Sequence, residues 1–92
     1  MKLRYTKRAA RQIDKALDYV AAKSPQGAAR VRERLQDIVT LLQLHPYAGQ
    51  ATSRPGVRRF VLAPYPYLID YRVVGDDLIV VRFRHAAQRP TN

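Results

Sequence analysis

The feature that most constrains the fold is a long apolar stripe in the middle of the chain. Between residues 25 and 44, apolar side chains recur at alternating steps of three and four positions, which places them on one side of an α-helix. They are Ala28, Val31, Leu35, Ile38 and Leu42. Ser24 and Pro25 suit the start of this helix as N-cap and first helical residue, and Pro46 ends it by disfavouring the helical conformation at His45. A helix with one apolar side needs a second layer to cover that side.

A second helix and a short strand precede this stripe. Ala10, Ile13, Leu17 and Val20 repeat at three- and four-residue steps and predict a helix from about residue 7 to 22, with Thr6 as N-cap. The tight turn between the two helices predicts an αα-hairpin. Residues 2–6 alternate polar and apolar, which predicts a strand with Leu3 and Tyr5 on one face.

The second half of the chain has the pattern of β-structure. Residues 57–62, 67–74 and 78–85 are predicted strands, and residues 75–77 (Gly-Asp-Asp) form the turn between the last two. Residues 46–56 show little periodicity and are expected to form a loop. Alternation predicts that one face of the middle strand carries Tyr67, Ile69, Tyr71 and Val73. In the last strand it predicts Ile79, Val81 and Phe83 on one face, and Val80, Arg82 and Arg84 on the other.

These elements predict a single α+β domain spanning residues 1–92. The order is β-α-α-β-β-β: an N-terminal strand, an αα-hairpin, then a three-stranded antiparallel meander, with the helices packed on one face of an antiparallel sheet. A chain of 92 residues has room for one core, and 47% apolar residues are ordinary for a globular domain.

The charge of the chain suggests what it binds. Lys and Arg total 17 against 7 Asp and Glu, a net charge of +10. The cations lie in two segments, 1–34 and 54–92, on either side of a stretch without cations, so we expect two separate basic surfaces. Such a surplus indicates nucleic acid, an acidic protein or an anionic membrane surface as partner.

Several chemistries are unsupported by the residue types present. There is no cysteine, which removes thiolate nucleophiles and fits a reducing compartment. His45 and His85 have no further ligands at metal-binding spacing, and no glycine loop for phosphate is present, so we expect neither a metal nor a cofactor. No apolar run is long enough for a membrane span, and no signal peptide is visible, so we expect a cytoplasmic protein that does not bind a membrane.

Two groups of cations are candidate binding sites. Lys7, Arg8 and Arg11 crowd the first turns of the first helix, where the helix dipole disfavours positive charge. They form either an ordinary solvated face, relieved by Asp14 and Asp18, or a docking surface for an acidic partner. The second group consists of Arg82, Arg84, His85 and Arg89 in and after the last strand, with Arg58 and Arg59 on the first strand of the meander. It forms either a charged outer face or a surface for nucleic acid or a nucleoprotein.

The order and spacing of several segments resemble the RelE/ParE superfamily of bacterial type II toxins, and the ParE branch more closely. The long helix closes with Leu-Leu-Gln-Leu-His-Pro at 41–46, Gly-Val-Arg-Arg-Phe follows at 56–60, and Tyr-Pro-Tyr-Leu-Ile-Asp-Tyr-Arg-Val at 65–73. The last strand, residues 78–85, ends in His85 as in the family. The resemblance implies a toxin that a cognate acidic antitoxin neutralises. It also implies inhibition of DNA gyrase for ParE-like members and cleavage of mRNA on the ribosome for RelE-like members.

The residues that the ribonuclease members use are incompletely matched. Those members use an Arg in the central strand, an Arg after the last strand and a Tyr in a C-terminal extension. The corresponding central-strand position here is Leu68, and no Tyr follows Tyr71. ParE-like chains often have Gly and Arg after the terminal His, where this chain has Ala86, Ala87 and Gln88.

We therefore expect a non-catalytic toxin that binds DNA gyrase and meets DNA indirectly, through the gyrase complex. Its target contacts are expected at Arg82, Arg84, His85, Arg89, Arg58 and Arg59, and its antitoxin contacts at Lys7, Arg8 and Arg11. The alternatives are a ribosome-dependent mRNA endoribonuclease that uses Arg59, Arg82 or His85, and a general nucleic-acid-binding module.

Overall fold

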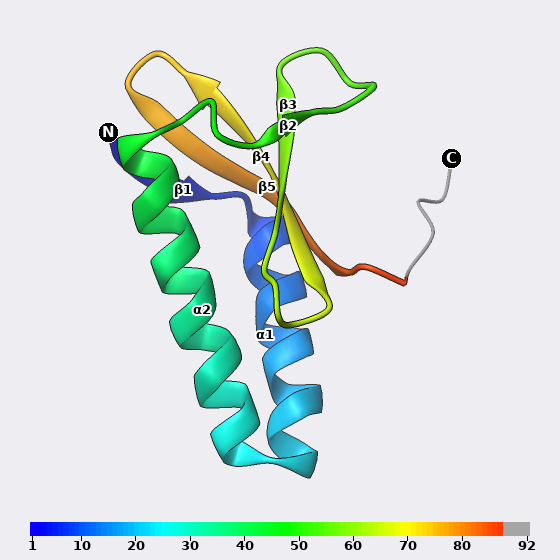
Figure 1. Ribbon diagram of the computed structural model, residues 1–92. Coiled ribbons are helices and arrows are strands. Elements are labelled where there is room, and N and C mark those ends of the chain that lie inside the picture. Colours follow the sequence, from blue (N-terminus) through cyan, green and yellow to red (C-terminus); the bar gives the residue numbers. More distant parts are fainter. Residues whose placement is uncertain (88–92) are drawn as a thin grey trace.

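The fold consists of a helical hairpin and a five-stranded sheet (Figure 1). It is taken from a computed structural model that describes residues 1–87. The elements are β1 (Lys2–Tyr5), α1 (Lys7–Lys23), α2 (Pro25–Leu44), β2 (Gln50–Ala51), β3 (Val57–Val61), β4 (Tyr67–Val74) and β5 (Asp77–His85). The predicted α+β class and element order are confirmed, and the predicted bounds of the helices and longer strands agree within one residue. Neither helix of the described residues is long and apolar enough to cross a membrane.

Both helices begin at the residues that the sequence indicated. The Thr6 hydroxyl accepts a hydrogen bond from the Ala9 backbone N–H at 3.0 Å, and the Ser24 hydroxyl accepts one from Gly27 at 3.0 Å. Each bond satisfies one of the free N–H groups in the first turn of a helix. Ser24 also ends α1, because its backbone N–H donates to the Val20 carbonyl. One residue therefore closes the first helix and opens the second, which keeps the hairpin turn short.

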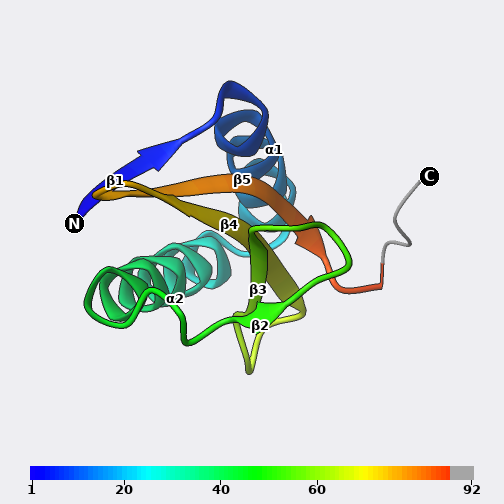
Figure 2. The same cartoon turned by 90° about the horizontal axis from the view of Figure 1, so that it is seen from above.

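The sheet is mixed rather than antiparallel throughout, which corrects the expectation. Its strand order is β1-β5-β4-β3-β2, and β1 runs parallel to β5 while the other pairs are antiparallel. The strands turn progressively across the sheet (Figure 2). The expected loop at 46–56 also contains the two-residue strand β2, which pairs with β3 at the sheet edge.

The core lies between the helices and one face of the sheet. It joins apolar residues of both helices to Tyr71, Ile69 and Phe83 of the central strands, which are at most 2% exposed. The predicted inward face of β4 is confirmed, because Tyr67, Ile69 and Tyr71 belong to this core and Val73 packs against it. The rings of Tyr67 and Phe83 stack with centroids 5.2 Å apart.

A β-bulge makes the predicted faces of the last strand partly wrong. Tyr71 pairs with Val80 and Asp70 pairs with Arg82, so Val81 is an extra residue in β5. One extra residue reverses the in-out alternation of a strand. Val80 is therefore fully buried in the core together with Phe83, although alternation had placed the two on opposite faces.

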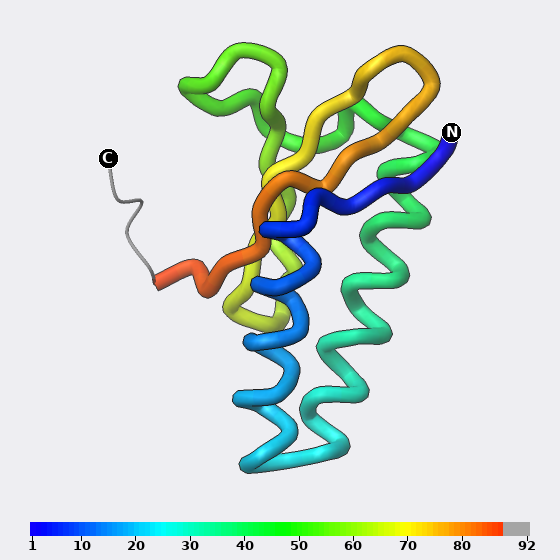
Figure 3. Tube along the Cα trace, turned by 180° about the vertical axis from the view of Figure 1, so that it is seen from behind, coloured from blue at the N-terminus to red at the C-terminus, as the bar shows by residue number. Residues whose placement is uncertain are grey.

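The N-terminal segment runs beside β5 and continues into α1 (Figure 3). β1 pairs with the first half of β5 only, as far as Val80. Beyond that point, the Thr6 hydroxyl donates to the Val81 carbonyl at 3.4 Å, and the Phe83 N–H donates to the side-chain oxygen of Gln12 at 2.9 Å. Side chains from the start of α1 thus take the place of a neighbouring strand along the second half of β5.

Candidate functional site

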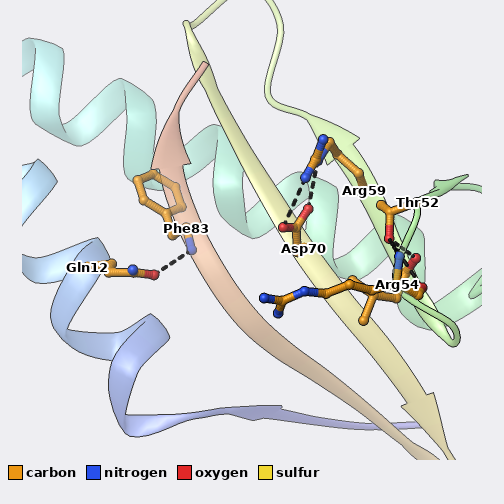
Figure 4. Close-up of polar contacts among 7 residues, drawn as sticks. Gln12, Thr52, Arg54, Arg59, Asp70 and Phe83 are labelled. Carbon is orange, nitrogen blue, oxygen red and sulfur yellow. Dashed lines mark hydrogen bonds and ion pairs between the residues drawn. The ribbon is translucent and has the colours of Figure 1, made fainter. Parts of the chain in front are cut away.

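Arg54 and Arg59 lie on the face of the sheet that points away from α2 (Figure 4). Cross-strand pairing puts Arg59 of β3, Asp70 of β4 and Arg82 of β5 in one row across three adjacent strands. Arg84 stands two residues beyond Arg82, and alternation places it on the same face. We call this surface the arginine face and define it by Arg54, Arg59, Arg82 and Arg84 around Asp70.

A buried ion pair lies at the centre of the arginine face. Arg59 donates to both carboxylate oxygens of Asp70, from Nε at 2.8 Å and from a terminal nitrogen at 3.2 Å. Asp70 is 5% exposed, whereas the Arg59 side chain remains about one-third exposed. The hydrogen bonds to Asp70 raise the pKa of Arg59. A two-point contact of this kind fixes the plane of the guanidinium group.

Arg82 lies close to other positive charges. Burial lowers its pKa from the ordinary value, and the charges of Arg8, Arg54 and Arg84 lower it further, while Asp70 acts in the opposite direction. The positive potential on this face therefore exceeds what Asp70 neutralises. An anion bound beside Arg82 would reduce this positive potential.

The loop before β3 holds Arg54 over the sheet. The Thr52 hydroxyl accepts a hydrogen bond from the Arg54 N–H at 3.2 Å and donates to the Val57 carbonyl at 2.9 Å. The Val57 N–H in turn donates to the Arg54 carbonyl. Gly56 has a φ of 77°, a conformation that glycine adopts without steric cost. From this turn the Arg54 side chain extends across β4 toward β5 (Figure 4).

The structure separates the candidate target residues into three places. Arg59, Arg82 and Arg84 share the arginine face. Arg58, the neighbour of Arg59, points to the other side of β3, where it donates to the Gly49 carbonyl at 2.8 Å and lies over the Tyr47 ring. His85 packs edge-on against the Tyr67 ring on the helix side, and its Nδ1 accepts a hydrogen bond from the Ala87 N–H. Arg89 lies outside the described residues.

The candidate antitoxin residues lie on α1. Lys7, Arg8 and Arg11 are all exposed. Arg8 is near enough to Arg82 for its charge to lower the pKa of that group. The charges of the two basic segments of the sequence therefore act on one another through Arg8 and Arg82.

A groove lies between α1 and the end of β5. Its volume is about 520 Å³, and apolar and aromatic side chains line it together with cationic ones. The lining residues are Gln12, Lys15, Ala16, Tyr19, Tyr67, Phe83, Arg84 and His85. Lys15 continues the i, i+4 series of Lys7 and Arg11, so the row of cations on α1 leads toward this groove.

Sequence reasoning missed Arg54 and Asp70 as parts of the site. Arg54 follows a loop serine and precedes Pro-Gly, a turn signal that indicated a bend but not its direction. Asp70 sits in a strand whose apolar residues drew attention to the opposite face. Among residues 1–87, no group of three His, Cys, Asp or Glu side chains could hold a metal ion.

Comparison with known proteins identifies the family. The profile described as "ParE toxin of type II toxin-antitoxin system, parDE" matches residues 3–90. The Sinorhizobium fredii protein Y4kP is 34% identical over 88 residues, covering 96% of this chain and 91% of that protein.

Solved structures agree with the sequence match. A chain from the chromosomal ParDE system of P. aeruginosa has a TM-score of 0.79 at 30% identity, covering 92% of this chain and 95% of that chain. The E. coli RelE toxin shares the fold, with a TM-score of 0.72 at 18% identity over 96% of this chain and 86% of that one. From the profile match and these similarities, the chain belongs to the ParE toxin family of type II toxin–antitoxin systems.

Proposed function

We propose that this toxin inhibits DNA gyrase by binding it, without cleaving RNA, and that the arginine face contacts the target. The observation that carries this proposal is the gathering of Arg59, Arg82 and Arg84 on one exposed side of the sheet, around the single buried carboxylate of Asp70. Guanidinium groups arranged in this way are suited to anionic and planar partners. Membership of the ParE family, for which the resemblance implied inhibition of DNA gyrase, supports gyrase as the proposed target.

The surroundings of the arginines favour binding over catalysis. Cleavage of a phosphodiester needs a general base and a general acid beside the phosphate. The carboxylates on the arginine face are engaged, Asp70 with Arg59 and Asp77 with Arg4. His85, the imidazole that the ribonuclease alternative would use, lies on the other side of β5 against Tyr67.

We propose further that a cognate acidic antitoxin neutralises the toxin through α1. Lys7, Arg8 and Arg11 offer exposed cations to its carboxylates, and the groove beside Lys15 and Tyr19 offers apolar surface for an anchoring side chain. Charge complementarity would speed the capture of the toxin more than it would raise the final affinity. We propose that both the capture by the antitoxin and the inhibition of gyrase take place in the cytoplasm.

Two assays on the purified chain test the proposed target. In a gyrase supercoiling reaction, the protein should inhibit supercoiling or accumulate cleaved DNA at micromolar concentration. In a translation reaction with purified ribosomes and a defined mRNA, the message should stay intact. Inactivity against gyrase together with cleavage of the message at defined codons would replace this proposal with the ribonuclease alternative.

A further inference from the structure

We infer that the arginine face binds the phosphodiester backbone of a nucleic acid directly. This inference rests on the proposed function only in using the same face, and it goes beyond contact with gyrase. Most cations of this face are arginines, including Arg4 and Arg72 at its edges, with Lys2 beside Arg4 at the start of β1. Arginine forms paired hydrogen bonds with phosphate oxygens, and protein–nucleic acid interfaces are more positively charged than protein–protein interfaces.

Hydrogen bonds hold the Arg59 side chain and the backbone that carries the other arginines in position before any ligand arrives. Asp70 accepts two hydrogen bonds from Arg59. The hydrogen bonds of Thr52 fix the turn that carries Arg54. Arg82 and Arg84 extend from a strand that α1 braces through Gln12. A preorganised set of donors loses less conformational entropy on binding than flexible surface lysines would.

The surface between the arginines distinguishes a phosphate backbone from an acidic peptide. Peptide partners gain most of their affinity from apolar or aromatic anchors seated in pockets. Between the arginines, the apolar side chains of Leu68 and Val57 are buried at 6% and 8% exposure, whereas Val61 at the end of β3 is half exposed. Of two grooves in the described chain, one lies between α2 and Tyr65, and the other lies beside α1 and meets the arginine face at Arg84. Neither groove is lined by Arg54, Arg59 or Arg82, and this positively charged part of the face fits phosphates.

Binding of labelled nucleic acid to the toxin alone, without gyrase, tests this inference. We expect fluorescence anisotropy to show binding of a short DNA duplex whose affinity falls steeply with salt, because bound phosphates release counterions. Arg82→Gln should weaken binding on the order of ten-fold and reduce the salt slope by about 1. Arg32→Gln is the matched control, since it removes the same charge from the exposed surface of α2. It should leave the slope unchanged.

Further arms separate the possible ligands. A single-stranded RNA of equal length, bound more tightly than the duplex with the same dependence on Arg82, would identify RNA as the source of the phosphates. Equal losses from Arg82→Gln and Arg32→Gln would overturn the inference, because binding would then follow net charge alone. The inference would also be overturned if polyglutamate displaced the duplex and if binding of polyglutamate itself required Arg82. Because the binding assay contains no gyrase, a negative result in it does not affect the proposed inhibition of gyrase. In the same way, a failed supercoiling assay does not affect the result of the nucleic-acid binding assay.

Discussion

At the scale of single residues, Asp70 organises the site by holding Arg59 in a buried two-point contact. Removing its charge should cost stability, because the guanidinium would lose its charged acceptor in a nearly dry environment. We expect Asp70→Asn to lower the free energy of unfolding by about 2 kcal/mol, measured by urea denaturation. Asp77→Asn is the matched control: it breaks the exposed pair with Arg4 and should cost under about 1 kcal/mol. Equal losses would mean that burial of Asp70 contributes nothing.

Tyr71 makes the free energy of unfolding depend on pH in the alkaline range. Its hydroxyl donates to the Pro46 carbonyl at 2.7 Å and accepts from the Gly49 N–H at 2.9 Å, and burial raises its pKa. The folded protein therefore keeps this proton at pH values where the unfolded chain loses it. The resulting stability is complete below about pH 10 and is lost as the pH rises through the folded pKa.

Urea denaturation of Tyr71→Phe at two pH values checks this account. At about pH 8 the variant should be less stable by about 1 kcal/mol, since Phe leaves the Pro46 carbonyl without its donor. Between about pH 8 and about pH 10.5 its stability should fall less than that of the parent. The exposed Tyr47→Phe serves as control and should retain the full fall. An undiminished fall in Tyr71→Phe would show that another group is responsible.

Single-residue roles were only partly predictable from the sequence. Alternation along the last strand correctly placed Arg82 and Arg84 together. The burial of Asp70 could not be predicted, because an acidic residue in a strand normally faces solvent. Its burial depends on Arg59, which comes from a different strand. The prediction grouped Arg58 with Arg59, although neighbouring residues of a strand point to opposite faces.

At the scale of elements, the contact between α1 and β5 determines where the arginine face ends. The Gln12 side chain accepts a hydrogen bond from the Phe83 N–H, in the part of β5 that β1 no longer pairs with. Gln12→Ala would leave that partly buried donor without its acceptor, and we expect a loss of about 1 kcal/mol in unfolding free energy. The exposed Gln36→Ala on α2 should change stability by less than about 0.5 kcal/mol. Thermal unfolding of the two variants side by side gives the comparison, and equal melting temperatures would contradict the role of Gln12.

The helices were predictable because their signals are local. Ser24, Pro25 and the apolar stripe each act within a few residues, and the structure follows them closely. The bulge at Val81 was not predictable, since it is a property of the pairing between β4 and β5. The parallel pairing of β1 also depends on contacts far apart in sequence, namely Leu3 with Leu78. Long-range pairing was therefore the part of the fold that the sequence pattern did not reveal.

At the scale of the whole molecule, the two basic segments of the sequence approach each other beside β5. The start of α1 brings Arg8 near enough to Arg82 for its charge to lower the pKa of that group. An antitoxin seated on α1 would lie beside the arginine face. It could therefore block the face by covering it, without changing the shape of the toxin.

The most direct test of the account measures how much inhibition of gyrase depends on the arginine face. The concentration of toxin that halves supercoiling should be determined for Arg82→Gln/Arg84→Gln and for a matched double variant on α2, Arg30→Gln/Arg32→Gln. Both lose two charges. The account predicts that the first variant needs on the order of ten-fold more protein, equivalent to about 1.4 kcal/mol of binding energy, and that the second inhibits like the parent. Unchanged inhibition by Arg82→Gln/Arg84→Gln, with the α2 variant also active, would contradict the account.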